Sequence, residues 1–475
     1  MIQNTGIIPT PKKACLAAEI MTVAPMIHCM ETQWQELTDV IIRSAAKIYG
    51  LELQKGEGGI VIIRDETLAP ESYRLKAGEG VSIFASDYQG ACYGAASLLQ
   101  LLKKDGTIQR VEIEDWPDKD YRGLMINFVK YWHPFYTLLN YVDLCFYFKI
   151  KYFHLHLTDV QNYTLPSRRF PKLTETGNSY TEEEIRTLRA YARARGVTLV
   201  PELDLPGHAS IFNQVYPEIF SDTKDPSYEG EMAENGRISS VICAGNPKTY
   251  EAVLALTDEM LELFPESPYI HLGSDEANYH QWDHCLHCQQ YIREHQLKDS
   301  KDLYAEFVGR LTDYVLSKGR TPIIWEGFSE ENAHHISRDV IVVGWENLYQ
   351  PSDRLLENGF KLINCAWKPL YIVEYEGKIY HYDDIMDWNV YEWRNWLEAS
   401  AAFKEPVRVE PTDKVLGAQV CVWSIHYEDG IVRTAENTAA MAERVWTVMD
   451  GCTPEAFETK LQPVMDGLLR LIGEQ

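Results

Sequence analysis

The stretch Tyr269-Ile270-His271-Leu272-Gly273-Ser274-Asp275-Glu276 decides which fold the sequence predicts. A short apolar run of the kind found in buried strands ends at Gly273-Ser274, and two adjacent carboxylates follow directly. Successive residues at a strand end point to different sides, so Asp275 and Glu276 can approach one ligand from two directions. Two carboxyls in different environments can take different pKa values, one protonated and one charged. The alternative is a solvated helix N-terminus, where acidic residues are also favoured.

Seven more apolar runs of strand length alternate with helical patterns along the chain. The eight runs are residues 123–128, 152–157, 198–202, 269–273, 321–325, 340–345, 361–366 and 417–423, and helical patterns cover 181–195, 249–263 and 302–317. Strands that alternate with helices predict parallel βα units, and eight units in about 350 residues fit a (β/α)8 TIM barrel. A doubly wound open sheet is the alternative, but no glycine-rich nucleotide-binding turn favours it.

The residues before the barrel predict a small N-terminal α/β accessory domain. Strands are expected at 61–63, 80–85 and 111–113, and a helix at 93–103. The polar, proline-containing segment 114–118 is typical of a domain boundary. We therefore divide the chain into an accessory domain over residues 1–117 and a catalytic (β/α)8 barrel over residues 118–475.

The charge and composition exclude several classes of partner. The 475 residues include 70 acidic and 45 basic side chains, a net charge of −25, which opposes binding to nucleic acid or an anionic membrane. No apolar run is long enough to span a bilayer. The first 13 residues have no apolar core of a signal peptide, so we expect a cytoplasmic protein, although a trimmed secreted chain would look the same. The ten scattered cysteines fit reduced thiols, and the oligomeric state stays open.

Polar and aromatic residues gather at the ends of the predicted strands, where a TIM barrel carries its catalytic groups. The residues at or just beyond these ends are His156, Asp159, Glu202, Asp204, His208, Asp275, Glu276, Trp325, Glu326, Trp345, Glu346, Asn347, Trp367, Tyr371 and Trp423, and Arg122 precedes the first of the strands. Aromatic faces stack on the C–H faces of sugars and carboxylates bind hydroxyls, so this rim predicts a carbohydrate site. A single tryptophan is more often a packing residue, so the prediction depends on the whole set.

This ordered series of motifs resembles glycoside hydrolase family 20, the exo-β-N-acetylhexosaminidases. The motifs are IIPTPK at 7–12, YRGL at 121–124, HLHLTD at 154–159, PELDLPGH at 201–208, HLGSDE at 271–276 and AERVW at 442–446. They cover nearly the whole chain, and the first is typical of the family's N-terminal α/β domain.

The resemblance implies a retaining hydrolase that needs no cofactor and removes terminal β-linked N-acetylhexosamine from a glycan or glycoconjugate. By this resemblance Glu276 is the general acid, and the substrate's own 2-acetamido oxygen is the nucleophile, giving an oxazoline-type intermediate. Asp275 orients the acetamido group and stabilises its charge, and Tyr371 donates a hydrogen bond to its oxygen. Asp159 and His208 contact the acid, and we expect them, with partial burial, to raise the pKa of Glu276. The alternative is a catalytically impaired sugar-binding protein on the same fold.

The resemblance also implies how the sugar is held. Arg122 would bind the O3 and O4 hydroxyls of the sugar, and Trp325, Trp345 and Trp423 would wall its pocket. Trp388 is a fourth candidate for this wall, in a loop that the sequence alone does not place.

The sequence departs from the family pattern on the C4 and C6 side of the sugar. Val373 stands where the family often has an Asp, no Glu follows Trp423 because Ser424 and Ile425 stand there, and 159–163 read DVQNY where DDQGW is common. Replacement hydroxyl partners could come from Glu374, His426, Glu428 or Asp429. Otherwise discrimination at C4 is relaxed, and the galacto epimer is accepted.

A separate cluster reads HCLHC at residues 284–288, with His280 one turn upstream. Cys285 and Cys288 share a helix face and could bind zinc, but a second pair of ligands at a suitable spacing is missing. We therefore predict no metal, with chelators leaving the activity unchanged.

Overall fold

Eight parallel strands close into a barrel in the computed structural model, which describes residues 5–175, 177–221, 240–373, 380–448 and 451–473. The strands are β8 (Tyr121–Asn127), β9 (Tyr152–His156), β12 (Thr198–Glu202), β13 (Tyr269–His271), β14 (Thr321–Trp325), β15 (Ile341–Gly344), β16 (Lys361–Asn364) and β20 (Val415–Ser424). They pair in chain order, and β20 pairs with both β16 and β8, which closes the sheet. Each predicted run forms one of these strands, so the predicted fold class is confirmed.

Side chains along each barrel strand alternate between the barrel interior and the surrounding helices. In β14, Ile323 and Trp325 belong to the interior cluster, whereas Ile324 packs in the outer one. In β15, Val343 points inwards and Val342 outwards. Burial on both faces explains why these strands read as continuous apolar runs in the sequence. The same alternation places Trp325, the last residue of its strand, on the interior face.

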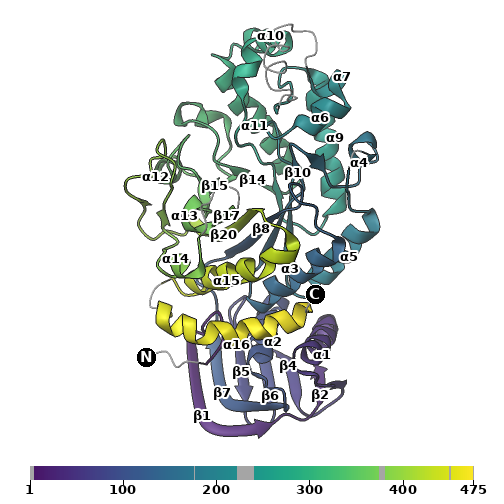
Figure 1. Cartoon of the computed structure of the whole chain (residues 1–475), viewed down its shortest axis with the longest axis vertical. Coiled ribbons are helices and arrows are strands. Elements are labelled where there is room, and N and C mark those ends of the chain that lie inside the picture. The colour runs from purple at the N-terminus through teal and green to yellow at the C-terminus, as the bar shows by residue number, and fades with distance from the viewer. Residues whose placement is uncertain (1–4, 176, 222–239, 374–379, 449–450, 474–475) are drawn as a thin grey trace.

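Helices surround the barrel, and three of them match the predicted helical patterns (Figure 1). The longer ones are α3 (Phe135–Tyr147), α5 (Glu182–Arg193), α9 (Pro247–Leu263), α11 (Ser300–Ser317) and α15 (Tyr427–Trp446). Each predicted helix begins at a polar cap: Thr181 forms a capping box with Glu184 before α5, and Asn246 and Asp299 cap α9 and α11. Such caps satisfy the first backbone N–H groups of a helix.

Short elements fill the loops above the barrel and beside it. The helices are α4 (Lys172–Glu175), α6 (Ser210–Val215), α7 (Pro217–Phe220), α10 (Leu286–Glu294), α12 (Ser352–Glu357) and α14 (Tyr382–Met386), with 3-10 turns η2 (Tyr279–Asp283) and η3 (Glu330–His335). Two small hairpins pair β10 (Thr158–Asp159) with β11 (Asn162–Tyr163), and β18 (Glu392–Trp393) with β19 (Val407–Arg408).

The seventh barrel strand is shorter than the sequence suggested, and Tyr371 lies on a strand of its own. β16 ends at Asn364, whose side-chain amide donates to the carbonyls of Val390 and Glu392. A turn, α13 (Trp367–Leu370), then leads into β17 (Tyr371–Val373), which pairs with the carboxyl-terminal half of β20. This ninth strand carries Tyr371 beyond the end of β16, at the rim of the barrel.

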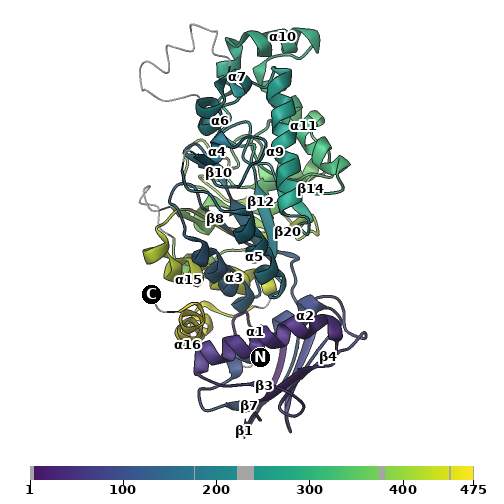
Figure 2. The same ribbon diagram turned by 90° about the vertical axis from the view of Figure 1, so that its right-hand side faces the viewer.

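The small domain is a seven-stranded sheet in the order β1-β7-β5-β6-β4-β2-β3. Its strands are β1 (Lys13–Thr22), β2 (Met26–Cys29), β3 (Gln54–Lys55), β4 (Ile60–Arg64), β5 (Tyr73–Ala77), β6 (Val81–Ala85) and β7 (Thr107–Asp115), and η1 (Thr32–Trp34) precedes its first helix. The helices α1 (Gln35–Tyr49) and α2 (Tyr88–Leu101) lie between this sheet and the barrel, beside the last helix α16 (Pro454–Ile472) (Figures 1 and 2).

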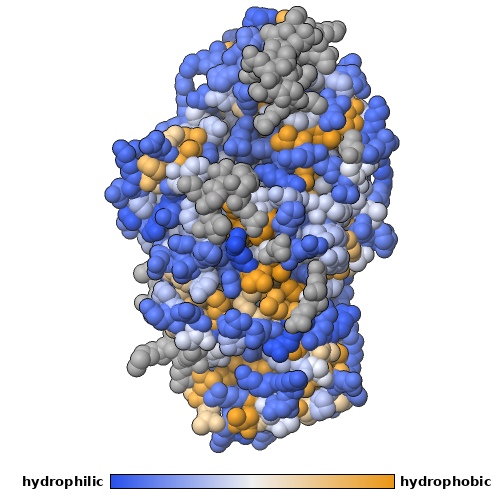
Figure 3. Space-filling view, viewed as in Figure 1, coloured by the Kyte–Doolittle hydropathy of each residue, from blue (hydrophilic) through white to orange (hydrophobic). Residues whose placement is uncertain are grey.

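The surface of the molecule agrees with its acidic composition. The face shown in Figure 3 is mostly hydrophilic, with smaller hydrophobic areas between the polar residues. Among the described residues, no helix combines the length and the apolar character that a membrane crossing requires.

Candidate active site

The two adjacent carboxylates follow β13 through a sharply turned backbone. Gly273, Ser274 and Glu276 have φ angles of 62°, 77° and 45°, in the left-handed region that side chains other than glycine rarely adopt. A Cβ at Gly273 would come within 1.8 Å of Asp204 Oδ1, so only glycine fits there. The turn buries Asp275, which is 4% exposed, and leaves the Glu276 side chain 53% exposed. The structure therefore gives the two acids different environments.

His208 brings the four predicted acid–base residues together. Its Nδ1 lies 3.1 Å from Asp159 Oδ1, and its Nε2 lies 3.3 Å from Glu276 Oε2 and 3.9 Å from Asp275 Oδ2. Asp159 is itself held by Asn127 at the end of β8, whose amide donates to Oδ2 at 2.9 Å. Three strand ends thus meet at one imidazole, as the barrel rule predicted from the sequence.

The charges at this cluster reverse one expectation. Burial opposes a charge on His208, but Asp204 and the hydrogen bonds to Asp159 and Glu276 outweigh it and raise the His208 pKa well above its ordinary value. The hydrogen bond from His208 in turn lowers the pKa of Glu276, against the effect of burial. The predicted rise in the Glu276 pKa is therefore wrong for the unliganded protein, because a protonated imidazole stabilises the carboxylate. Both shifts favour an ion pair of protonated His208 and ionised Glu276.

Asp275 shows the opposite shift. Burial raises its pKa to about 6, although the charge of His208 acts against the rise. Its Oδ1 is buried and has no hydrogen-bond partner within the described part of the chain. A buried polar atom without a partner costs free energy unless a ligand pairs with it. Asp275 is thus oriented to receive a donor from a bound molecule.

Tyr371 offers a second buried polar atom at the same rim. The residue is 1% exposed, and its hydroxyl finds no hydrogen-bond partner among the residues that the structure describes. The ring stacks on Trp367, with centroids 4.6 Å apart, and lies parallel to Trp345 at 6.0 Å. The negative charge of Asp275 is close enough to raise the Tyr371 pKa further than burial alone does. Tyr371 therefore offers a donor within an aromatic enclosure, at the same end of the barrel as the acceptor of Asp275.

Aromatic rings enclose this part of the rim. Trp423 lies 5.7 Å from Trp325 and 6.0 Å from Tyr371, and Trp345 lies 6.3 Å from Trp325, all measured between ring centroids. Trp325 is fully buried and donates its Nε1–H to Glu202 Oε1 at 2.7 Å. It forms the base of the enclosure, and Trp345 and Trp423 stand around it. The structure thus brings three of the four predicted tryptophans together.

Trp388 does not join them. It is fully buried in the outer cluster, and its Nε1–H donates to the carbonyl of Glu392 at 2.9 Å. The prediction that Trp388 walls the pocket is therefore wrong, because this indole packs in the outer cluster and not inside the barrel. Trp367 takes a place in the enclosure instead. The sequence had placed Trp367 at the rim but had not counted it among the tryptophans of the pocket wall.

Arg122 lies at the wrong end of the barrel for sugar binding. It stands near the start of β8, and its guanidinium donates to the carbonyls of Lys149 and Asp120, both at 3.1 Å, and pairs with Glu71 of the small domain at 3.2 Å. The substrate-binding prediction for Arg122 is therefore wrong, because the rim lies at the opposite end of that strand. Its contacts secure the small domain to the barrel.

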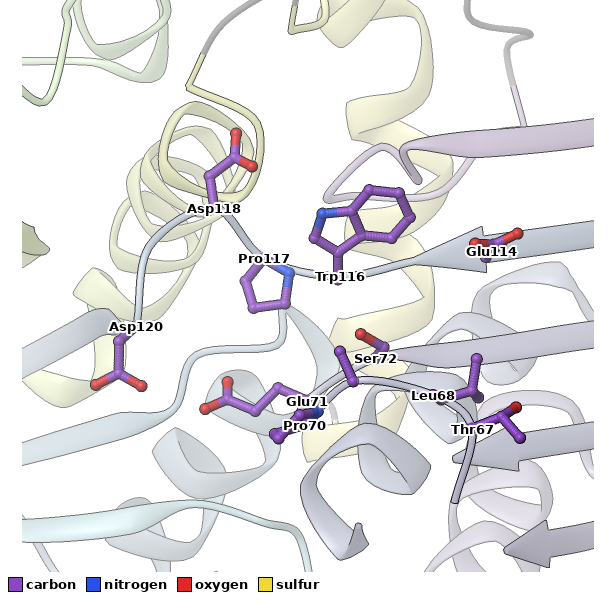
Figure 4. A pocket seen from close by; sticks show the side chains of 11 residues that line it. Thr67, Leu68, Pro70, Glu71, Ser72, Glu114, Trp116, Pro117, Asp118 and Asp120 are labelled. Atoms are coloured by element: carbon purple, nitrogen blue, oxygen red, sulfur yellow. The ribbon is translucent and has the colours of Figure 1, made fainter. Parts of the chain in front are cut away.

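A cavity of about 490 Å³ lies beside this junction. Residues 67–72 of the small domain and residues of the link to β8, among them Trp116 and Asp118, line it (Figure 4). The carboxylates of Glu71 and Asp120 border it, at the amino-terminal end of the barrel and so away from Glu276.

Lys130 supplies a positive charge at the end of the barrel that carries Glu276. It follows β8 by three residues, its Nζ lies 5.3 Å from the ring centroid of Trp423, and its charge helps to lower the pKa of Glu276. Lys130 was not among the predicted site residues, although it lies just beyond the first predicted strand.

Another carboxyl group at the rim, Glu346, was noted in the sequence without a role. It is 8% exposed, and burial together with the charge of Glu276 raises its pKa to about 8, so it is largely protonated at neutral pH. Glu326 fixes the loop beyond it by accepting backbone N–H groups of residues 347–350. Glu346 therefore offers a hydrogen-bond donor at the rim.

The C4 and C6 side keeps the apolar character seen in the sequence. Val373 lies on the same interior face as Tyr371, while Ile425 packs in the outer cluster. Of the suggested replacements, His426 packs against Tyr131 with the ring centroids 4.0 Å apart and the rings tilted, and Glu428 is exposed. Glu374 and the side chain of Asp429 lie outside the described residues.

Beneath the rim, Glu202 binds three histidines inside the barrel. His154 Nε2 and His271 Nδ1 lie 3.1 Å and 2.9 Å from its oxygens, and His156 also contacts it. Such a group could hold a metal ion in principle. The Glu202 carboxylate also accepts a hydrogen bond from the Trp325 Nε1–H. We therefore interpret Glu202 and the three histidines as a buried hydrogen-bond network that supports the floor of the site.

A closed parallel barrel with paired carboxylates and an aromatic enclosure at its rim defines the class of barrel-fold glycoside hydrolases. Residues 120–449 match the glycosyl hydrolase family 20 catalytic domain, and residues 4–116 match domain 2 of that family. The chain therefore belongs to glycosyl hydrolase family 20.

Relatives share both its sequence and its architecture. A β-hexosaminidase of Porphyromonas gingivalis is 27% identical over 441 residues, which are 86% of this chain and 55% of that protein. A β-hexosaminidase of Akkermansia muciniphila is 26% identical over 427 residues, 83% of each protein. An exo-β-N-acetylglucosaminidase of Vibrio harveyi, solved in complex with N-acetylglucosamine, has a TM-score of 0.84 at 22% identity, covering 99% of this chain and 78% of that one. The structural likeness shows the fold.

Proposed function

We propose that the protein is an exo-acting β-N-acetylhexosaminidase that releases terminal β-linked N-acetylglucosamine or N-acetylgalactosamine from glycans or glycoconjugates. The observation that carries this proposal is the pair of buried, unpartnered atoms, Asp275 Oδ1 and the Tyr371 hydroxyl, beside the half-exposed carboxyl of Glu276. An acetamido group offers one N–H and one carbonyl oxygen, which match this acceptor and this donor. The alternative, a binding protein without catalysis, leaves the poised carboxyl of Glu276 unexplained.

In this proposal the substrate provides its own nucleophile. The 2-acetamido oxygen attacks the anomeric carbon while Glu276 protonates the departing glycosidic oxygen, and the C–O bond breaks. The Asp275 carboxylate accepts a hydrogen bond from the acetamido N–H and stabilises the positive oxazolinium ring. The Tyr371 hydroxyl donates a hydrogen bond to the attacking oxygen. Glu276 then takes a proton from a water molecule that opens the ring, which restores the configuration. Because the nucleophile is tethered, the protein mainly orients it and stabilises charge.

The acid needs a proton that the unliganded protein keeps on His208. A sugar seated over Glu276 displaces water from its carboxylate, which raises the pKa of that carboxyl. His208 Nε2, 3.3 Å from Glu276 Oε2, can then pass its proton across, and Asp159 on the other ring nitrogen keeps the imidazole in place. The pair therefore holds one proton in common, and its position depends on whether the site is filled.

The acetamido requirement tests the proposed function directly. We expect a thiazoline analogue of N-acetylglucosamine to inhibit competitively and far more tightly than the sugar itself, because it mimics the cyclised intermediate. Aryl β-glucosides and β-galactosides without the acetamido group should be nearly inert in the same assay. Efficient cleavage of these plain glycosides, or no turnover of an aryl N-acetylglucosaminide, would overturn the proposal.

Discrimination at C4 should be loose. A site that hydrogen-bonds a hydroxyl rejects its epimer strongly, because buried polar groups then lose their partner. Val373 offers no such group, so we expect kcat/KM for the N-acetylgalactosaminide within about tenfold of that for the N-acetylglucosaminide, about 1.4 kcal/mol or less. Val373→Asp should shift the preference towards the gluco epimer, whereas Val373→Leu, which adds no oxygen, should not. A wild-type preference for the gluco epimer of several hundredfold would contradict this prediction.

A further inference from the structure

Three cysteines from two different loops meet beside the active-site rim. Cys243 lies in the loop between β12 and α9, while Cys285 and Cys288 lie at the start of α10. The sulfur of Cys243 is 3.4 Å from that of Cys285 and 3.7 Å from that of Cys288. All three residues are buried, with at most 4% of their surface exposed. The sequence showed two ligands of a possible metal site, and Cys243 is the third.

The spacing of the sulfurs fits ligands of one ion. None of the three cysteines is in a disulfide, whose sulfurs stand about 2.05 Å apart. Thiolates at the tetrahedral corners around zinc, each about 2.3 Å from the metal, stand about 3.8 Å from one another. The two measured separations are close to this edge length, and the three sulfurs lie within 4.8 Å of one another.

Backbone N–H groups point at two of the three sulfurs. The backbone N–H of Gly245 donates to Cys288 Sγ and that of Cys288 to Cys285 Sγ, each at 3.4 Å. A Cβ at Gly245 would come within 2.5 Å of the Cys288 Cα, so only glycine allows this approach. Backbone donors that point at sulfur stabilise negative charge there, as metal-binding thiolates require.

We propose that Cys243, Cys285 and Cys288 bind one zinc ion as thiolates, with a solvent molecule as the fourth ligand. Zinc is the divalent ion that this soft, compact set of sulfurs suits best. Binding displaces the thiol protons into solvent, so the affinity should fall as the pH is lowered. This revises the expectation of no metal, which rested on the apparent lack of further ligands.

The ion would join two loops that carry the catalytic residues. The β12–α9 loop contains His208, and the loop that leads from β13 to α10 contains Asp275 and Glu276. These loops already touch where the Trp282 Nε1–H donates to the carbonyl of Ile242 at 2.9 Å. α10 stands at the end of the molecule far from the small domain, beside α7 (Figures 1 and 2). A zinc ion bound to the three cysteines would fix the distance between the His208 imidazole and the Glu276 carboxyl without contacting the sugar.

Elemental analysis of the full chain tests the site without any activity measurement. We expect about one zinc per chain in protein purified under reducing conditions and dialysed against metal-free buffer, and less than about 0.1 in Cys243→Ser and in Cys285→Ser. Cys92→Ser, which changes a buried cysteine of the small domain, is the matched control and should keep the metal. Loss of zinc should also lower the melting temperature by roughly 5–10 °C, since a ligand that binds only the native state stabilises it.

Two measurements on the wild-type protein decide the matter even if the serine variants fail to fold. Capping the thiols with an organomercurial should release one zinc, read by a zinc-binding dye. Cobalt added to the zinc-free protein should give a thiolate-to-metal charge-transfer absorption. Wild-type protein with less than about 0.1 zinc and no cobalt–thiolate band would overturn the proposal, as would zinc retained in Cys243→Ser.

Discussion

Replacing Glu276 with Gln is expected to lower kcat on an N-acetylglucosamine disaccharide by about 10²- to 10⁴-fold, the usual contribution of a general acid. The glutamine keeps the shape and one hydrogen-bonding oxygen but cannot deliver a proton to a poor leaving group. His208 Nε2, at 3.3 Å, would still face the side chain, so the geometry of the cluster should persist. Steady-state kinetics on the disaccharide measure the effect.

The leaving group separates lost acid catalysis from a damaged site. Substrates with an acidic phenol need little protonation, so the loss in Glu276→Gln should be much smaller with them than with the disaccharide. Glu251→Gln, on the exposed surface of α9, is the matched control and should behave as wild type. Near-normal activity of Glu276→Gln on the disaccharide, or an equal loss with both substrates, would contradict the assignment of the acid.

The barrel could be predicted from the sequence because strands buried on both faces leave unmistakable apolar runs. β14 was predicted residue for residue, and the paired acids after β13 lie at the rim as expected. The separate strand β17 could not be foreseen. β16 ends at Asn364, whose amide donates to carbonyls 26 and 28 residues further along the chain, and β17 pairs with β20 instead. Periodicity within a strand holds no information about such a contact.

The errors at the site also have physical causes. Arg122 belongs to a recognisable motif, but its position at the start of β8 places it at the opposite end of the barrel from the site. Trp388 has the residue type of a sugar-stacking wall, yet its Nε1–H finds a backbone acceptor inside the outer core. Residue type therefore suggested a role that the direction of each side chain excludes.

Properties that depend on contacts between segments far apart in the chain were the hardest to predict from the sequence. Cys243 is 42 residues from Cys285, and no spacing rule connects a lone cysteine to a CxxC across that distance. Partial burial and contact with Asp159 and His208 were expected to raise the Glu276 pKa, whereas the protonated imidazole of His208 lowers it. A pKa depends on the balance of burial and neighbouring charge, and only the structure gives both.

Replacing Asp275 with Asn should lower kcat/KM by about 10²- to 10³-fold, similar to removing one group that stabilises developing charge. In the proposed mechanism Asp275 stabilises the positive oxazolinium ring, so it acts on cyclisation and not on the leaving group. The loss should therefore remain undiminished with acidic phenol leaving groups, in contrast to that of Glu276→Gln. Asp339→Asn, on an exposed loop before β15, provides the matched control.

The pH dependence gives an independent measurement of the same role. Burial raises the Asp275 pKa to about 6, and only its ionised form can stabilise a cation. As the pH falls through about 6 the carboxylate is protonated, so wild-type kcat/KM for an aryl N-acetylglucosaminide should decline on the acid side. The asparagine side chain of Asp275→Asn cannot titrate, so this decline should disappear from the remaining activity of that variant. An unchanged acid limb in the variant would assign the titration to another group, and a loss that vanishes with good leaving groups would remove Asp275 from the cyclisation step.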